Sequence, residues 1–252
     1  MTRVALVTGG QQGIGLGVAA ALVGAGFSVA LAAEVAPETP AVGAALAALG
    51  EAARYFRHDL RDVAAAPELL DRIAAEMGPV SCLVSNAGVP SPARGDMLDA
   101  TPENFDFVLS VNLRGGFFLA QAAARRMLAL PAAPYRSIVF ITSVSAGMVS
   151  VERADYCVSK AGAAMMARLF AARLAAEGIG VFDLRPGIIA TPMTAGVRDR
   201  HSARIADGLV PAGRWGEPSD IGAAILPLVR GDMAFATGAV IPVDGGLSIA
   251  RL

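Results

Sequence analysis

The first 34 residues limit the possible folds of this chain more than any other segment does. Between Arg3 and Glu34 there is no charged residue, and the stretch divides into a largely apolar run at 3–7, a glycine-rich turn at 8–15 and a second apolar run at 27–32. Apolar runs this short predict buried strands, and the segment 13–23 between them has the length of a helix. The pattern predicts a βαβ unit, in which a helix joins two parallel strands.

The turn of this unit reads Thr-Gly-Gly-Gln-Gln-Gly-Ile-Gly. Because glycine has no Cβ, backbone amides at the start of the following helix can approach an anion closely, and a pyrophosphate is the natural guest of such a turn. A purely structural turn is the alternative. The candidate residues of a phosphate site are Gly9, Gln11, Gln12, Gly13, Ile14 and Gly15.

Alternating strand and helix patterns continue to the end of the chain. Further strands are predicted at 52–56, 80–84, 137–142, 181–184 and 239–243, and further helices at 41–49, 67–77, 105–127, 154–176 and 218–229. No repeat or compositional break marks a second domain, so residues 1–252 are expected to form one α/β domain. The polar segment 192–212 is a candidate lid over a pocket.

Polar residues follow several of the predicted strands at their carboxyl ends, where open α/β sheets bind ligands. Asp59 and Leu60 follow the third strand, and Asn86, Ala87 and Gly88 follow the fourth. A helix cap and a simple turn are the alternatives for these two groups. Asn112 lies inside a long apolar helix pattern, where a buried amide requires hydrogen-bond partners.

Tyr156 and Lys160 are a candidate catalytic pair. Lys160 is the only lysine, whereas the other 20 basic residues are arginine, which indicates that position 160 requires an amine. Residues four apart lie on the same face of a helix, so the two side chains would project together. The alternative is a packed tyrosine beside a solvated helix charge.

Composition argues against several functional classes. The net charge is −1 and the pI about 6.1, which gives no reason to expect nucleic-acid binding. Cys82 and Cys157 form no CxxC motif, and His58 and His201 have no metal-ligand spacing, so we expect no metal and a reducing cytoplasm. The glycine-rich turn interrupts the first apolar run after a strand length, so no membrane span or targeting segment is expected. Hydrophobic residues make up 54%, which predicts an oligomer.

Taken together, these motifs closely resemble the short-chain dehydrogenase/reductase family in its single-domain form. The resemblance rests on Thr8–Gly15 (TGxxxGxG), Asn86-Ala87-Gly88, Asn112, Ser143, Tyr156 with Lys160 (YxxxK), Pro186-Gly187 with Thr191, and the ending Val243–Gly246. It implies a Rossmann-type, doubly wound sheet of seven parallel strands with helices on both faces. It also implies NAD or NADP, a homotetramer, and further cofactor contacts from Pro186, Gly187, Ile189 and Thr191.

The resemblance further implies roles for individual residues. In reduction, Tyr156 would protonate the carbonyl oxygen of the substrate while the nicotinamide delivers a hydride to carbon. Ser143 would hold that oxygen. Lys160 would bind the nicotinamide ribose and stabilise the tyrosinate, and Asn112 would hold a water that links Lys160 to solvent.

The chain departs from the family pattern at two places that bear on function. Asp183 and Arg185 replace more neutral residues before the Pro-Gly turn; they lie on one face of a strand and are placed to pair. Glu34 follows the second strand, Gln12 stands where a cation often occurs, and no cation is evident nearby for a 2′-phosphate. Glu34 therefore favours NAD over NADP.

The sequence predicts an NAD(P)-dependent oxidoreductase that interconverts a secondary alcohol and a ketone. Reduction of a 3-oxoacyl thioester is one candidate reaction, and oxidation of a small polyol, sugar or hydroxy acid is the other. Met148, Val149, Met193 and Leu209 would form an apolar pocket wall, Arg153, Arg198 and Arg200 could attract an acidic substrate, and Arg125-Arg126 is a candidate surface for an acyl carrier. A non-catalytic dinucleotide sensor is the alternative from a different class.

Overall fold

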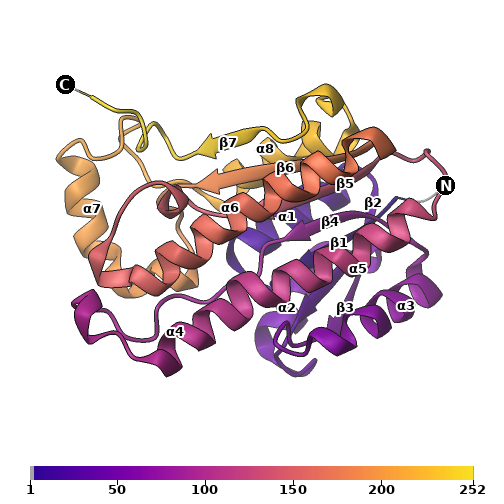
Figure 1. Ribbon diagram of the computed structural model, residues 1–252, viewed down its shortest axis with the longest axis horizontal. Coiled ribbons are helices and arrows are strands. Elements are labelled where there is room, and N and C mark those ends of the chain that lie inside the picture. The colour runs from indigo at the N-terminus through magenta and orange to yellow at the C-terminus, as the bar shows by residue number, and fades with distance from the viewer. Residues whose placement is uncertain (1–2, 252) are drawn as a thin grey trace.

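The computed structural model describes residues 3–251. It contains one seven-stranded sheet, in which every pair of neighbouring strands is parallel. The strand order is β3-β2-β1-β4-β5-β6-β7, as expected for a doubly wound fold (Figure 1). The strands are β1 (Arg3–Thr8), β2 (Phe27–Ala33), β3 (Ala53–Arg57), β4 (Val80–Ser85), β5 (Arg136–Ile141), β6 (Ile179–Pro186) and β7 (Val240–Val243). The predicted fold class is therefore confirmed.

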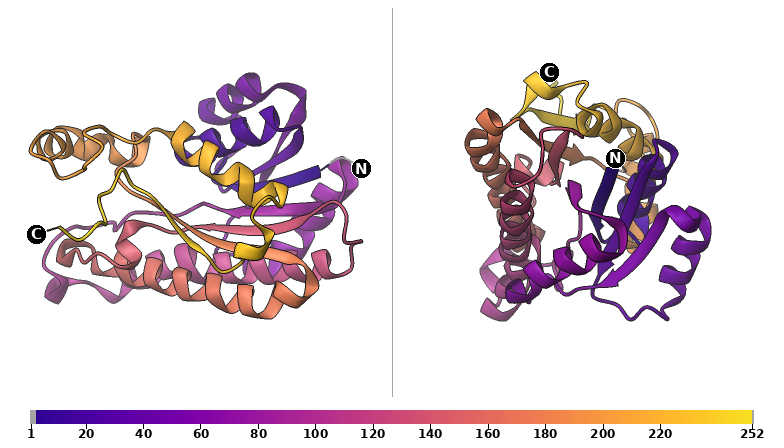
Figure 2. Two further views of the ribbon diagram at one scale, coloured as in Figure 1. Left: turned by 90° about the horizontal axis from the view of Figure 1, so that it is seen from above. Right: turned by 90° about the vertical axis from the view of Figure 1, so that its right-hand side faces the viewer.

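Helices pack on both faces of the sheet (Figure 2). One core cluster joins the sheet to α3 (Ala66–Met77), α5 (Gly116–Leu128) and α6 (Ala154–Leu174). The other joins it to α1 (Gly13–Gly24), α2 (Pro40–Leu49) and α8 (Pro218–Arg230). Because both faces are covered, the inner strands read as continuous apolar runs instead of alternating ones.

The order of the strands reverses beside β1. From β1 the chain proceeds outward through β2 and β3, then crosses back to β4 and proceeds outward in the other direction. The loops after β1 and β4 therefore diverge at the carboxyl edge and leave a crevice between them, which is where open α/β sheets bind ligands. In Figure 1 the arrowheads of β6 and β7 point toward the side on which α7 lies.

Two helical segments differ from the sequence pattern. The run at 105–127 is not one α-helix: α4 (Pro102–Leu109) and α5 are joined by a π-helical turn, Ser110–Gly115, which contains Asn112. Inside 192–212 the structure has a 3-10 segment, Pro192–Val197, and α7 (Arg198–Ala206), which the pattern did not predict. Thr194 helps to start this segment, since its Oγ1 accepts a hydrogen bond from the Thr191 amide and donates to the Ile189 carbonyl.

The continuous helical run Pro102–Leu128 is long and apolar enough to cross a membrane by those criteria alone. Its inner face is instead part of the core, with Leu119, Ala120 and Met127 packed against the sheet. The apolar character of this run is therefore explained by packing inside the domain.

The pairing of Asp183 and Arg185 is confirmed. Both lie on β6, with Arg185 Nη2 2.8 Å from Asp183 Oδ2. Asp183 is buried and also accepts a hydrogen bond from the Thr142 hydroxyl at the end of β5. The pair thus links the exits of two strands that border the site.

Candidate active site

The glycine-rich turn places the amino end of α1 against the loop after β1. Gly9 and Gly13 have positive φ angles of 65° and 52°, which glycine adopts without strain. A Cβ on Gly15 would clash with the Gly9 carbonyl oxygen and lie 2.7 Å from Asn86 Nδ2. The helix can begin this close to the loop only because position 15 has no side chain.

The loops after β1 and β4 are joined by Thr8 and Asn86. Thr8 Oγ1 accepts hydrogen bonds from the backbone amides of Asn86 and Ala87, both at 2.9 Å. In return, Asn86 Nδ2 donates to the Thr8 carbonyl at 2.8 Å. This reciprocal pairing fixes the two sides of the crevice and explains why an amide follows β4.

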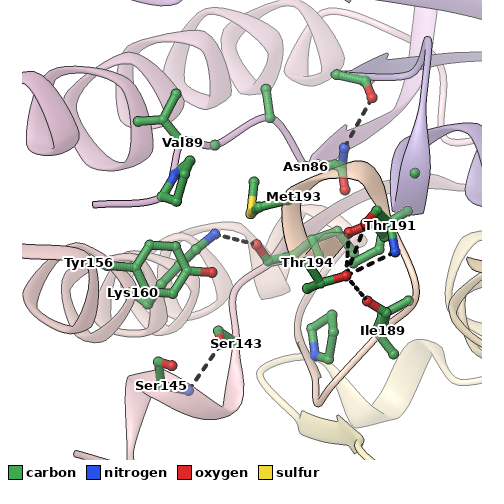
Figure 3. A pocket seen from close by; sticks show the side chains of 18 of the residues that line it. Asn86, Val89, Ser143, Ser145, Tyr156, Lys160, Ile189, Thr191, Met193 and Thr194 are labelled. Atoms are coloured by element: carbon green, nitrogen blue, oxygen red, sulfur yellow. Dashed lines mark hydrogen bonds between the residues drawn. The ribbon is translucent and has the colours of Figure 1, made fainter. Parts of the chain in front are cut away.

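Tyr156 and Lys160 project from one face of α6, and Figure 3 shows them side by side with Ser143 on a neighbouring loop. Lys160 Nζ lies 5.7 Å from the centroid of the Tyr156 ring and donates to the Ile141 carbonyl at 3.1 Å. Lys160 is only 6% exposed, so its ammonium group is held at a defined position below the tyrosine. Ser143 Oγ accepts the Ser145 amide at 3.0 Å, which leaves the Ser143 hydroxyl proton free to be donated.

Asn112 braces the loop after β4 instead of lining the cavity. Its Oδ1 accepts the Val89 amide at 2.7 Å, while its Nδ2 donates to the Val89 carbonyl at 3.0 Å and to Ser159 Oγ at 3.1 Å. These bonds satisfy the amide and account for a polar residue in this helix. Gly88 lies close to both Asn112 and Lys160, because a Cβ there would be 3.1 Å from Asn112 Oδ1 and 3.6 Å from Lys160 Nζ.

The sequence missed two cations near Glu34. In the sheet Ala33 is paired with Arg57, and Arg57 Nε donates to the Glu34 carbonyl at 3.0 Å. Arg61 lies near Glu34 as well, but its guanidinium group binds Asp59, with Nη2 2.6 Å from Oδ2. The hydrogen bond from Arg61 holds the pKa of Asp59 below its usual value. The expectation that no cation lies near position 34 was therefore wrong.

A single cavity of about 560 Å³ extends along the carboxyl edge of the sheet. Nineteen predicted site residues line it, and Asn112 is the one that does not: the lining includes Gly9, Gln11, Gln12, Gly13, Ile14, Gly15, Glu34, Asp59, Leu60, Asn86, Ala87, Gly88, Ser143, Tyr156, Lys160, Pro186, Gly187, Ile189 and Thr191. The cavity therefore brings the predicted phosphate, nucleoside and catalytic groups into one continuous site.

The predicted substrate wall is largely present. Met148, Val149, Met193 and Leu209 line the cavity, together with Arg153 and Arg200. Arg198 does not line it and instead lies over the Trp215 ring, 5.8 Å from the centroid. Arg94, His201 and Arg204 line the cavity but were missed, because they occur in segments without a strand or helix periodicity that points inward.

The Arg125-Arg126 pair does not lie near the mouth of this cavity. It occupies the last turn of α5, which leads into the beginning of β5 and therefore lies toward the amino edge of the sheet. Arg126 Nη2 is also bound to Asp71 Oδ1 at 2.5 Å. The idea that this pair forms a basic surface beside the pocket was wrong.

The loop residues fit a dinucleotide. The side chain of Gln12, the N-cap of α1, makes no capping hydrogen bond, so it leaves the amides of the first helical turn open to an anion. Gln11 Oε1 is buried without a hydrogen-bond partner within residues 3–251 and belongs to a residue that lines the cavity. A bound donor, such as a ribose hydroxyl, would satisfy that oxygen.

A sequence model of one protein family matches almost the whole chain. This model, which is described as enoyl-(acyl carrier protein) reductase and represents short-chain dehydrogenases/reductases, covers residues 9–248. The chain belongs to the short-chain dehydrogenase/reductase family. The glycines of the glycine-rich loop and the Tyr156–Lys160 pair fall inside the matched region, and of that loop only Thr8 precedes it, so nearly all of the features that suggested this family are part of the match.

Other proteins of similar sequence and structure span nearly the full length of this chain. A 2-dehydro-3-deoxy-D-gluconate 5-dehydrogenase from Escherichia coli (strain K12) is 35% identical over 97% of this chain and 94% of its own length. The crystal structure of a 3-oxoacyl-[acyl-carrier protein] reductase from Brucella melitensis in complex with NAD is 47% identical, with a TM-score of 0.95 over 100% of this chain and 99% of that one.

A third relative carries the other nicotinamide cofactor. It is a structure from Agrobacterium tumefaciens, described as a 2-deoxy-D-gluconate 3-dehydrogenase with bound NADP, which is 32% identical with a TM-score of 0.85 over 97% of this chain and 96% of that one. Short-chain dehydrogenases/reductases of this type thus bind NAD or NADP. This chain is an NAD(P)-dependent oxidoreductase of that family.

Proposed function

We propose that the protein interconverts a secondary alcohol and a ketone, with Tyr156 as the proton donor in reduction and the proton acceptor in oxidation. The observation that carries this proposal is the placement of Tyr156, Lys160 and Ser143 around one end of a cavity whose other end has a dinucleotide loop. When bound, the reduced nicotinamide supplies a hydride to the carbonyl carbon. The proton that completes the alcohol comes from the Tyr156 hydroxyl.

Lys160 and Ser143 prepare this proton transfer. An ammonium group has three donors, and Lys160 uses one of them on the Ile141 carbonyl, which leaves two for ribose hydroxyls and for stabilising the tyrosinate. Ser143 can donate its hydroxyl proton to the substrate oxygen while its own oxygen accepts the Ser145 amide. Both side chains are oriented by backbone bonds and need little reorganisation during the reaction.

Asn112 is proposed to support the route by which Tyr156 regains a proton. Its Oδ1 accepts the Val89 amide and retains a second lone pair, on which a water between Asn112 and Lys160 can be held. The closeness of both groups to Gly88 supports this position for the water. A larger residue at position 88 would fill the space that the water needs.

We infer a preference for NAD over NADP. The Glu34 carboxylate lies at the end of β2, where it can accept hydrogen bonds from a ribose diol or repel a 2′-phosphate. The two neighbouring cations are engaged, since Arg61 is paired with Asp59 and Arg57 is bonded to the Glu34 carbonyl. Both are solvent-exposed bonds that a phosphate would have to replace in order to recruit them.

Two substrate classes are supported by different observations. The likeness to a 3-oxoacyl-[acyl-carrier protein] reductase supports reduction of a 3-oxoacyl thioester. The likeness to a sugar-acid dehydrogenase, and the arginines that line the cavity, support a small hydroxy acid, sugar or polyol.

A screen of substrates separates these classes. The purified protein would be assayed with NADH and with NADPH on acetoacetyl thioesters and cyclic ketones, and with the oxidised cofactors on sugars, sugar acids and polyols. Tyr156→Phe serves as the matched blank. We expect turnover of at least one class that is lost in this variant, whereas tight cofactor binding without any turnover would support a non-catalytic sensor.

We also propose an oligomeric state and a lid over the cavity. Apolar side chains that remain exposed on α5 and α6, namely Phe118, Val158, Met165 and Leu169, support a homotetramer. The free cysteines Cys82 and Cys157 support a location in the reducing cytoplasm. The segment 192–212 contributes residues to the cavity wall and is proposed to act as the lid. Light scattering of the purified protein would test the tetramer, with a monomeric mass as the contradicting result.

A further inference from the structure

Four arginines line the substrate end of the cavity, and the proposed hydride transfer uses none of them. This arginine cluster consists of Arg94, Arg153, Arg200 and Arg204. Among the lining residues at this end, all of which the structure describes, the one carboxylate is Glu152, which pairs with Arg200 at 3.4 Å. The other three guanidinium groups form no ion pair within residues 3–251, so the cluster has an uncompensated positive charge.

Arg153 connects the cluster to the reacting group. Its guanidinium carbon lies 5.4 Å from the centroid of the Tyr156 ring. Within the described part of the chain, its Nη2 and Nε donate only long hydrogen bonds of 3.4 Å, to the hydroxyls of Ser145 and Ser150 respectively. Donors that are positioned this loosely remain available to a ligand that enters next to Tyr156.

The loop that contains Arg94 is held against α6, the helix of Tyr156 and Lys160, by hydrogen bonds. Ser91 donates a hydrogen bond to the carboxylate of Asp155, and the same carboxylate accepts the Tyr156 amide at 2.7 Å. Ser91 and Asp155 are only 6% and 7% exposed. Arg94 is three residues from this anchor, which holds its loop against the beginning of α6.

The arginines are close enough to influence each other and a neighbouring histidine. Burial, followed by the charges of Arg153 and Arg200, lowers the pKa of Arg94. Burial, followed by the charges of all four arginines, lowers the pKa of His201. Among the residues that the structure describes, the buried Nδ1 of His201 has no hydrogen-bond partner. An anion in the cluster would relieve this repulsion and offer an acceptor to the guanidinium donors.

We propose that the arginine cluster binds a carboxylate of the substrate, so that the protein acts on small oxo acids and the corresponding hydroxy acids. This inference rests on the proposed function, because the carboxylate must sit beyond a carbonyl or hydroxyl carbon at Tyr156. It favours a free acid over a neutral acyl thioester delivered by a carrier protein. The basic pair Arg125-Arg126, which a carrier would need near the pocket, lies toward the opposite edge of the sheet.

A series of oxo acids of increasing chain length, together with their methyl esters, tests whether the arginine cluster binds a carboxylate. The probes are 3-oxobutanoate, 4-oxopentanoate and 5-oxohexanoate, each paired with its uncharged ester, and initial rates are measured with NADH. Acetoacetyl-coenzyme A and the neutral acetoacetyl-N-acetylcysteamine thioester form two further arms, which distinguish recognition of a phosphate from recognition of a carboxylate. We expect at least one acid to exceed its ester in kcat/KM by about tenfold or more.

Charge-neutralising variants identify the residues. Arg94→Gln and Arg204→Gln are expected to raise KM for the preferred acid about tenfold, with a smaller change in kcat. For the ester, KM is expected to change less than twofold. Arg125→Gln removes the same charge from an exposed position away from the cavity and is expected to leave KM and kcat unchanged for both the acid and the ester. Thermal unfolding of each variant shows that the protein remains folded.

Failure of this inference is distinguishable from failure of the proposed function. The carboxylate site is wrong if esters or thioesters are reduced with the same kcat/KM as the acids, or if Arg94→Gln and Arg204→Gln affect acid and ester equally. In either case the proposed oxidoreductase activity is still supported. The same conclusion follows if only neutral ketones are reduced. If no probe or screened alcohol is converted and Tyr156→Phe is indistinguishable from the wild type, both are wrong.

Discussion

Gly15→Ala should weaken dinucleotide binding strongly, because the added methyl group cannot be accommodated where the helix meets the turn. An ideal Cβ at position 15 would clash with the Gly9 carbonyl oxygen, lie 2.8 Å from the Gly9 carbonyl carbon and lie 2.7 Å from Asn86 Nδ2. Two of these neighbours are backbone atoms of a loop that is tied to Ala32, so they cannot rotate away. Either α1 or the loop must move.

The size of the effect follows from this displacement. Overpacking of this kind costs about 1–3 kcal/mol of folding free energy. Moving the loop also removes charge-assisted hydrogen bonds from the amides to the bound phosphates, which are worth about 1.5–3 kcal/mol each. The loss of two such bonds amounts to at least about 3 kcal/mol, which raises the Kd for NADH about a hundredfold.

Gly43→Ala is the matched control. Gly43 lies inside α2, and an added Cβ would have no atom of residues 3–251 within 4 Å apart from its chain neighbours and the backbone of its own helix, so alanine there should stabilise the helix by about 0.5–1 kcal/mol. Calorimetric titration with NADH and chemical denaturation would be measured for both variants. If folded Gly15→Ala binds NADH within twofold of the wild type, the proposed role of the turn is wrong.

Three further predictions concern single side chains. Lys160→Arg should reduce turnover about a hundredfold although the charge is kept, because a planar guanidinium group cannot take the place of the ammonium bonded to Ile141. Arg54→Lys, at an exposed position of β3 outside the cavity lining, is its control, and near-wild-type turnover of Lys160→Arg would refute the need for an amine. NADH should support faster turnover than NADPH, and Glu34→Gln should lower the ratio of NADH turnover to NADPH turnover about tenfold by removing a negative charge near a 2′-phosphate. A strong wild-type preference for NADPH would contradict this role of Glu34. Burial raises the pKa of the Cys82 thiol to about 12, so a thiol reagent at pH 8 should reach Cys157 alone until the protein unfolds, and rapid modification of both cysteines in the native protein would be inconsistent with the structure.

Much of the fold could be predicted because its determinants are local. Short apolar runs that end in glycine, asparagine or aspartate marked the strands and the edge at which ligands bind, and all seven predicted strands are present. The π-helical turn at Asn112 could not be predicted from periodicity, because it accompanies hydrogen bonds to Val89 in a distant loop. Likewise, α7 lies in a polar segment whose inward face is short.

The site followed the same division between local and long-range information. The glycine-rich loop and the Tyr156–Lys160 pair are recognisable from spacing alone. The position of Arg57 beside Glu34 depends on the register of β2 and β3, and the position of Arg94 depends on the contact between Ser91 and Asp155. Neither contact has a periodic signal, so the charges around the cofactor and substrate ends became visible only in the folded structure.

The most direct test of the central claim is transfer of a label from the cofactor. NADH carrying deuterium at both C4 positions of the nicotinamide would be incubated with the ketone identified in the screen, and the alcohol product would be analysed by mass spectrometry and NMR. We predict that one deuterium appears on the carbinol carbon with the wild type, and that Tyr156→Phe binds NADH with a similar Kd but transfers almost none. Unchanged transfer by Tyr156→Phe, or deuterium lost to solvent, would contradict direct hydride transfer with Tyr156 as the proton donor.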